Sequence, residues 1–222
     1  MREEVIIVAG GIGSRMKSEQ PKQFITVHDR PVIIHALEKF YTWKPDMHVV
    51  VVMNESFLDQ WTQIRERNFA GKDITTVAGG DTRFQSVRNG LSKLKYSGVV
   101  AIHDAARPCV SVKVIGDCFR VATLKKTAIP VLQVNESLRK IEADDSSSSV
   151  NRNDFIVVQT PQCFHTELLK EAYKVDFNAL FTDDASVVEA AGDEIHLVAG
   201  NPENIKVTEP SDLVLAEVFL RG

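Results

Sequence analysis

Three short segments of the chain combine glycines or charged side chains with a preceding apolar run. They span residues 9–16, 79–86 and 103–108. Glycines leave backbone N–H groups free to surround a phosphate chain, and nearby cations neutralise its charge. No Ser or Cys stands in an elbow motif, so a covalent mechanism is disfavoured. These residue types instead favour phosphoryl-type transfer that works by positioning and electrostatics.

The first segment, AGGIGSRM, is a candidate phosphate-binding loop. A dinucleotide-binding fingerprint does not fit, because Met16 stands where its third glycine should be, and no Gly-Lys-Ser/Thr closes a Walker loop. Arg15 in the loop and Lys22 in the following PKQF supply two cations. Each of them, taken alone, is as readily explained as a solvated surface charge.

The other segments each allow a structural and a functional interpretation. In GGDTRFQS, Asp81 or Thr82 could be a helix N-cap, or the double glycine could face a ligand. In HDAARP, His103 is more typical of a structural hydrogen-bonding histidine, and Asp104 with Arg107 could form only an ion pair. A fourth segment, NIKVTEP, places Lys206 at a strand end flanked by apolar residues, which favours a functional lysine. The alternative interpretation is a lysine on an edge strand.

The surrounding pattern predicts an α/β fold with a largely parallel sheet. Apolar, β-branched runs predict buried strands, and amphipathic stretches between them predict helices. The carboxyl ends of parallel strands meet at one edge, so the three segments should converge there. The expected strands are residues 5–8, 48–53, 74–77 and 99–103, and the expected helices are one after Pro31, 56–67 and 84–94.

Residues 131–153 predict an exposed β-hairpin whose tip is the run of serines at 146–149. Such an arm has no core of its own, so we expect it to pack on a second subunit and make a homodimer. A strand at 155–159 follows, then two helices, a strand at 195–199 and a helix at 210–219. We expect a single domain over residues 1–222.

Composition narrows the class of protein. The 222 residues carry a formal net charge of −4, which disfavours a general nucleic-acid binder. The three cysteines, Cys109, Cys118 and Cys163, lack CxxC spacing and are predicted to be reduced. No apolar run approaches the roughly 18 residues that cross a bilayer, and the first strand begins too early for a signal peptide to precede it. We therefore expect a soluble, cytoplasmic protein without a membrane partner.

Taken in order, the motifs AGGIGSRM, PKQF, GGDTRFQSV, HDAARP, VNRN, QTPQCF, TDDAS and NIKVTEP resemble the 2-C-methyl-D-erythritol 4-phosphate cytidylyltransferase family of the non-mevalonate isoprenoid pathway. The resemblance covers essentially the whole chain. It implies a Rossmann-like, three-layer nucleotidyltransferase fold. It also implies a reaction in which the acceptor phosphate attacks the α-phosphorus of CTP and pyrophosphate leaves, with Mg²⁺ bound to the nucleotide.

The resemblance assigns roles residue by residue. Arg15 and Lys22 would stabilise charge at the α-phosphate and leaving group, and Asp104 would lie at the polyol phosphate and near the metal. The segment around residues 9–13 would hold the triphosphate and ribose, and part of residues 80–86 would read the cytosine. The nucleotide-binding residues would be Ala9, Gly10, Gly11, Gly13, Gly80, Asp81, Ser86 and Ala105.

Arg107 is also assigned to the polyol phosphate by the resemblance, and Arg152 and Lys206 to the grip on that phosphate. In the family, the residues matching Arg152 and Ser137 come from the partner subunit's arm, in agreement with the predicted dimer. Because the site lacks the spacing of a permanent metal site, Mg²⁺ is expected to arrive with CTP.

The chain departs from the common family pattern in two segments. Residues 8–11 read VAGG where many members have Pro-Ala-Ala-Gly, and Glu136-Ser137 replaces the usual Asp-Thr. Gly10 is more typical of ribitol-5-phosphate cytidylyltransferases, and that activity is the second hypothesis for the function. HDAARP and the segment around Arg152 favour the isoprenoid enzyme. A non-catalytic CTP-binding module and a nicotinamide-dependent dehydrogenase are the alternatives from other classes.

Overall fold

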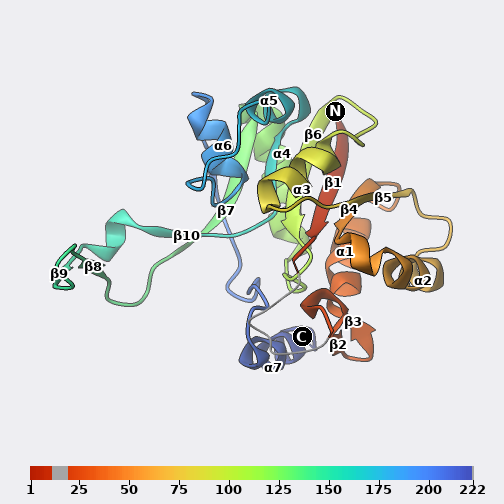
Figure 1. The fold of residues 1–222 in the computed structure, drawn as a ribbon, viewed down its shortest axis with the longest axis horizontal. Helices are drawn as coiled ribbons and strands as arrows, with labels where there is room; N and C mark the ends of the chain where they lie inside the picture. The colour runs from red at the N-terminus through yellow and green to blue at the C-terminus, as the bar shows by residue number, and fades with distance from the viewer. Residues whose placement is uncertain (12–19, 222) are drawn as a thin grey trace.

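The computed structural model describes residues 1–11 and 20–221. A mixed eight-stranded sheet lies at the centre of this part of the chain (Figure 1). The strand order is β10-β7-β11-β6-β1-β4-β5, with β12 beside β7. The β6-β1-β4-β5 half is parallel, whereas β11 runs antiparallel to β6 and β7. The strands are β1 (Arg2–Ala9), β4 (His48–Met53), β5 (Ile74–Ala78), β6 (Gly98–Asp104), β7 (Thr127–Gln133), β10 (Ile156–Val158), β11 (Gln162–His165) and β12 (Leu197–Ala199).

Helices cover both faces of the sheet because the central strands are apolar on both sides. In β1, Val5 and Ile7 pack into one core cluster, and Ile6 between them packs into the other. The first cluster includes Ile33 of α1 (Val32–Trp43), and α2 (Leu58–Asn68) and α4 (Val112–Lys125) lie on the same face. The second face carries α3 (Arg83–Leu91), α5 (Thr166–Ala172) and α6 (Asp184–Ala190). This arrangement confirms the three-layer α/β fold.

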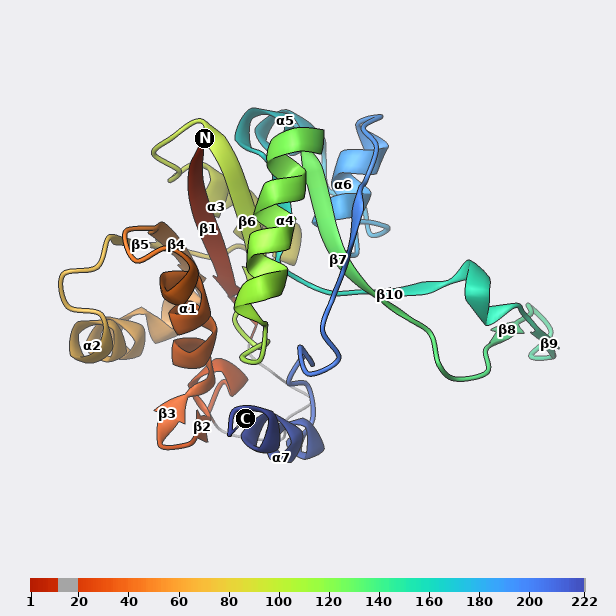
Figure 2. The ribbon, with the colours of Figure 1, turned by 180° about the vertical axis from the view of Figure 1, so that it is seen from behind.

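The last helix, α7 (Pro210–Phe219), lies beyond the carboxyl edge of the parallel strands (Figures 1 and 2). Ala216 of this helix and Val207 just before it pack against Ala106 and Cys109, which follow β6. A small hairpin, β2 (Thr26–Val27) and β3 (Arg30–Pro31), joins the same region. The segment that follows β6 is therefore packed against α7.

The arm projects from the body of the molecule, as both views show (Figures 1 and 2). β7 and β10 pair antiparallel at its base, and β8 (Arg139–Ile141) pairs with β9 (Ser147–Ser149) near its end. The predicted position of the tip is wrong. Three of the four serines form β9, and the turn consists of residues 142–146, with Asp145 in the left-handed region at φ 63°. Hydroxyl side chains tolerate the extended backbone on this exposed strand.

Most predicted elements are present, with small shifts at their ends. The strand predicted at 48–53 has the same bounds as β4, and the helix after Pro31 is α1. The sequence pattern did not predict α4 or β11. All three cysteines are free and buried, as expected for reduced side chains. Over the described residues, no helix is both long and apolar enough to span a membrane.

Candidate active site

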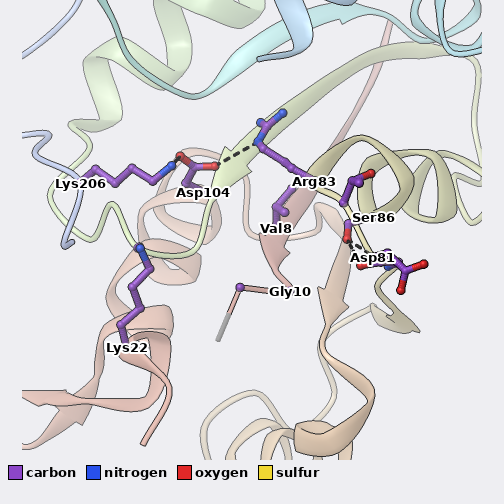
Figure 3. A pocket seen from close by; sticks show the side chains of 12 residues that line it. Val8, Gly10, Lys22, Asp81, Arg83, Ser86, Asp104 and Lys206 are labelled. Atoms are coloured by element: carbon purple, nitrogen blue, oxygen red, sulfur yellow. Dashed lines mark hydrogen bonds and ion pairs between the residues drawn. The ribbon is translucent and has the colours of Figure 1, made fainter. Parts of the chain in front are cut away.

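A cavity of about 220 Å³ opens where the parallel strands end (Figure 3). The ends of β1 and β6 and the turn between β5 and α3 meet there, as the strand pattern predicted. Lys22, in the short 3₁₀ helix Lys22–Phe24, and Lys206, before α7, complete the lining. The predicted site residues on its wall are Gly10, Gly11, Lys22, Gly80, Asp81, Ser86, Asp104 and Lys206.

The glycines in this wall serve two different purposes. A Cβ on Gly11 would meet no atom of the described residues within 4 Å, so packing against that part of the chain does not require glycine there. A Cβ on Gly80 would lie only 2.5 Å from the Cβ of Gln85. Ser86 holds this second turn, since its hydroxyl accepts a 3.1 Å hydrogen bond from the Gly80 N–H. Gly11 therefore leaves room for a ligand, and Gly80 permits a tight turn.

Thr82 is the N-cap of α3. Its hydroxyl accepts from the Gln85 N–H, and the Gln85 side chain accepts in return from the Thr82 N–H, which forms a capping box. The structural interpretation of this segment therefore applies to Thr82. Asp81 is exposed and lines the cavity, and Figure 3 shows its carboxylate pointing away from Lys22, Asp104 and Lys206.

A second cavity, of about 260 Å³, adjoins the first. The two share Arg83, Asp104 and Lys206 on their walls. Arg107 lines the second cavity and donates a 2.8 Å hydrogen bond to the Asn204 carbonyl. The remaining walls come from β10, β11 and the start of α6. Two adjacent spaces with a shared boundary can hold two reactants side by side.

Asp104 lies at this boundary among three cations. Lys206 Nζ is 2.8 Å from its Oδ2, Arg107 Nε is 3.7 Å from the same oxygen, and Arg83 Nε is 3.6 Å from Oδ1. Burial alone would raise the pKa of Asp104, but the three cations hold that pKa well below its usual range. The carboxylate is therefore charged throughout the neutral range, and it keeps the cations from repelling one another.

His103 has a structural role in this arrangement. Its ring lies between the Thr160 hydroxyl, 3.0 Å from Nδ1, and the Arg107 carbonyl, 3.1 Å from Nε2. It also packs edge-to-face against Phe40. Burial lowers the pKa of His103 to about 4, so the ring is neutral at pH 7. It orders the loop that carries Asp104 and Arg107 and does not line either cavity.

Some predicted residues are not on the cavity walls. Ala9 and Ala105 are buried in the core, where the Ala9 carbonyl accepts from the Gln23 side chain and the Ala105 N–H donates to the Val8 carbonyl. Ala106, which was given no role from the sequence, lines the first cavity instead. Gly13 and Arg15 lie outside the described residues.

The arm, which carries Ser137 and Arg152, projects from the body of the molecule (Figures 1 and 2), and neither residue lines either cavity. Ser137 is exposed just before β8, and Arg152, in the 3₁₀ helix Arg152–Asp154, donates to the Asn135 carbonyl. The structure therefore does not bring these two residues to the site within one chain.

Arg83 is a site residue that was given no role from the sequence, although it stands in the GGDTRFQS motif. It lines both cavities, and its guanidinium group forms two hydrogen bonds, of 3.0 and 2.6 Å, with the buried Asp184. Its place close to Asp81, in a turn between a strand and a helix, was the signal that could have marked it.

The donor groups present here do not form a metal centre on their own. Within the described part of the chain, no cluster of three His, Cys, Asp or Glu side chains could hold a metal ion. Asp104 offers a single carboxylate, and cations already contact both of its oxygens. This donor set fits a divalent ion held mainly by the ligand's own phosphates.

The fold and the two cavities define an α/β nucleotidyltransferase, because a glycine-lined cavity with a flanking lysine adjoins a cationic cavity at the carboxyl edge of the sheet. Residues 4–222 match the family model of 2-C-methyl-D-erythritol 4-phosphate cytidylyltransferase (IspD). The chain belongs to this family.

Individual relatives agree with this assignment. The chain is 46% identical over 220 residues to the 2-C-methyl-D-erythritol 4-phosphate cytidylyltransferase of Phocaeicola vulgatus, covering 99% of this chain and 100% of the relative. It is 44% identical to the protein of that name from Bacteroides thetaiotaomicron, with the same coverage. A solved structure of the enzyme from Thermus thermophilus superposes with a TM-score of 0.79, at 31% identity, over 100% of both chains.

Proposed function

We propose that this chain transfers CMP from CTP to 2-C-methyl-D-erythritol 4-phosphate, giving the CDP-linked product and pyrophosphate in isoprenoid precursor synthesis. Family membership supports the reaction. The observation that carries the proposal is the pair of adjoining cavities that meet at Asp104 and Lys206. CTP occupies the glycine-lined cavity, and the acceptor occupies the second.

The nucleotide is held by backbone and short side chains. Gly10 and Gly11, with Gly13 beyond the described residues, surround the triphosphate. The turn at Gly80, Asp81 and Ser86 faces the cytosine, whose exocyclic amine needs an acceptor and whose carbonyl needs a donor. The carboxylate of Asp81 supplies the acceptor and the Asp81 N–H supplies the donor, because the Gly80 and Thr82 N–H groups already donate to Ser86 and Gln85 within the turn.

Chemistry proceeds by direct attack of the acceptor phosphate on the α-phosphorus of CTP. Lys22, which lines the nucleotide cavity, stabilises the charge that builds on the α-phosphate and leaving pyrophosphate, and Arg15 shares this role. Loss of one preorganised donor of this kind raises the barrier by roughly 2.7–4 kcal/mol. A divalent ion bound with CTP, which we take to be Mg²⁺, would neutralise phosphate charge, and Asp104 is the side chain that would contact it, by exchanging one of its contacts with the surrounding cations.

The acceptor phosphate binds in the second cavity, against Arg107 and Lys206. Asp104 accepts from the polyol side of the acceptor and keeps Lys206 extended toward the phosphate. We also propose that the enzyme is a cytoplasmic homodimer, in which Ser137 and Arg152 of one arm complete the acceptor site of the partner. The exposed apolar side chains on the arm support this, since Ile141 is 76% and Phe155 46% exposed.

The experiment is a turnover assay of purified protein with CTP and each acceptor separately, following pyrophosphate release. 2-C-methyl-D-erythritol 4-phosphate should be turned over far faster than ribitol 5-phosphate, and Lys22→Ala should lower that rate by about 10²–10³-fold. Faster turnover of ribitol 5-phosphate would instead identify the chain as a ribitol-5-phosphate cytidylyltransferase. Absence of turnover with both, in wild type and variant alike, would leave a CTP-binding module.

A further inference from the structure

Arg83 connects the two walls of the site. It is the first residue of α3, directly after the turn that contains Gly80 and Asp81 on the nucleotide side. Its guanidinium group reaches Asp184, the first residue of α6, on the acceptor side, through hydrogen bonds of 3.0 and 2.6 Å. Paired hydrogen bonds between guanidinium and carboxylate fix orientation as well as distance.

Asp184 is itself held in place from several directions. It has no exposed surface, and its Oδ1 also accepts a 2.6 Å hydrogen bond from the Tyr173 hydroxyl. The Gln162 side chain accepts from the Asp184 N–H at 3.0 Å and from the Ala185 N–H at 2.9 Å. Because Gln162 lies in β11 beside β6, Asp184 forms a rigid anchor on the sheet.

Arg83 also divides the contacts of the Asp104 carboxylate. Its Nε faces Oδ1 at 3.6 Å, while Lys206 and Arg107 both face Oδ2. Figure 3 shows Asp104 between Arg83 on one side and Lys206 on the other. Without a charge at Oδ1, the carboxylate could rotate, and Lys206 would lose its fixed partner.

We propose that Arg83 is a positioning residue for cytidylyl transfer. Through its hydrogen bonds to Asp184, it fixes the Asp104 carboxylate and the wall of the second cavity relative to the turn that contains Gly80 and Asp81. This inference rests on the proposed function. The transfer reaction needs the acceptor phosphate aligned with the α-phosphorus, and a misplacement of about 1 Å costs on the order of 100-fold in rate.

A purely structural role for Arg83 makes a different prediction. Breaking a buried ion pair by removing one partner destabilises a protein, whereas removing both charges together often does not. Arg83→Met leaves Asp184 buried and unpaired, so that variant should unfold at lower denaturant concentration. The double variant Arg83→Met/Asp184→Asn removes both charges and should recover much of the stability.

The test measures unfolding midpoint, CTP dissociation constant and acceptor kcat/KM for Arg83→Met, the double variant and Arg83→Lys. Arg88→Met is the matched control, because Arg88 lies on the same helix, is exposed and lines neither cavity. We expect acceptor kcat/KM to fall about 100-fold in Arg83→Met and to stay low in the double variant despite its recovered midpoint. Arg83→Lys, which keeps the charge without the paired hydrogen bonds, should fall at least about tenfold. CTP affinity should change by less than about threefold throughout.

Recovery of acceptor turnover together with stability in the double variant would overturn the proposal, since Arg83 would then act through stability alone. A rise in the CTP dissociation constant equal to the loss in kcat/KM would also overturn it, by assigning Arg83 to nucleotide binding. Normal turnover in Arg83→Lys, with its folding intact, would contradict the need for the anchored geometry. Failure of the proposed function is distinguishable, because wild type and Arg88→Met would then be inactive as well.

Discussion

Lys206 Nζ lies 2.8 Å from Asp104 Oδ2, at the boundary between the nucleotide cavity and the acceptor cavity. The pair joins the segment before α7 to the end of β6, which are far apart in the sequence. Asp104 is buried, and the Lys206 side chain is 40% exposed. Lys206 can therefore keep one contact with the protein and present its remaining N–H groups to a ligand.

Lys206→Met should lower acceptor kcat/KM by about 10²–10³-fold, because it removes a fixed positive charge from the acceptor cavity. The effect on CTP affinity should be smaller, since Lys22 remains in the nucleotide cavity. Steady-state kinetics with each substrate varied in turn will measure both effects. Lys113→Met is a suitable control, because Lys113 is 82% exposed, pairs with Asp117 on α4 and lines neither cavity. If acceptor kcat/KM fell equally in Lys206→Met and Lys113→Met, Lys206 would have no specific role in the site.

Gly11→Ala should weaken CTP binding without weakening the fold. The added Cβ meets no described protein atom within 4 Å, so the free energy of unfolding should stay within about 0.5 kcal/mol of wild type. Gly80→Ala is the comparison, because its Cβ would lie 2.5 Å from the Gln85 Cβ and should destabilise the fold by about 1–3 kcal/mol. Urea unfolding and a CTP titration distinguish the two. If Gly11→Ala binds CTP normally, the ligand does not occupy the space beside Gly11.

Two inactive variants should complement each other if the arm completes the partner's site. In a 1:1 mixture of Arg152→Ala and Lys206→Ala, half of the randomly assorted dimers are mixed, and each of these has one intact site. The mixture should therefore recover about a quarter of wild-type activity after subunit exchange. Sedimentation confirms the dimer, and unmixed variants provide the baseline. No recovery in a mixed dimer would place both residues in the same chain's site or outside it.

Glu4→Gln should destabilise the fold by about 1–3 kcal/mol at pH 7 and leave turnover unchanged. Glu4 is buried near the amino end of β1, at the opposite end of the parallel strands from the two cavities. It accepts hydrogen bonds from His48 and from the Lys95 and Tyr96 N–H groups. Burial opposes ionisation, but these hydrogen bonds lower the pKa of Glu4 below its ordinary value.

The sign of the pH dependence follows from that lowered pKa. The carboxylate's contribution to stability is fully present above the unfolded-state pKa of about 4.3 and is lost as pH falls through the folded-state value. The difference between wild type and Glu4→Gln should therefore narrow below about pH 4. Urea midpoints at several pH values test this, and a difference that widens in acid would contradict it.

Local patterns were sufficient to predict the fold class and the sheet edge at which the glycine-lined cavity lies, whereas the roles of its residues were implied by the family resemblance. Apolar strands ending in glycines or an Asp indicated the edge at which Gly10, Gly80 and Asp104 meet, because parallel strands fix that convergence. α4 was not predicted although its face is regular, and β11 is only four residues long. The serines of β9 were assigned to a turn by their composition, but pairing with β8 decides their conformation.

The role of Arg83 was beyond local patterns for a different reason. Its anchor, Asp184, is 101 residues away in the chain, and only the packing of α3 and α6 on the same face of the sheet brings them together. Ala105 shows the opposite error, because it was predicted to bind the nucleotide but does not line the cavity. It stands in a motif with Asp104, yet the chain turns its side chain into the core, and Ala106 reaches the cavity.

The most direct test of the central claim follows the α-phosphorus itself. Purified protein is mixed with CTP radiolabelled at that position, with and without 2-C-methyl-D-erythritol 4-phosphate, and the labelled species are separated. If the acceptor in the second cavity attacks CTP in the first, the label will appear in the CDP-linked product, only when acceptor is present, and none will remain on the protein. Label bound to the protein, or CMP released without acceptor, would contradict direct transfer between the two cavities.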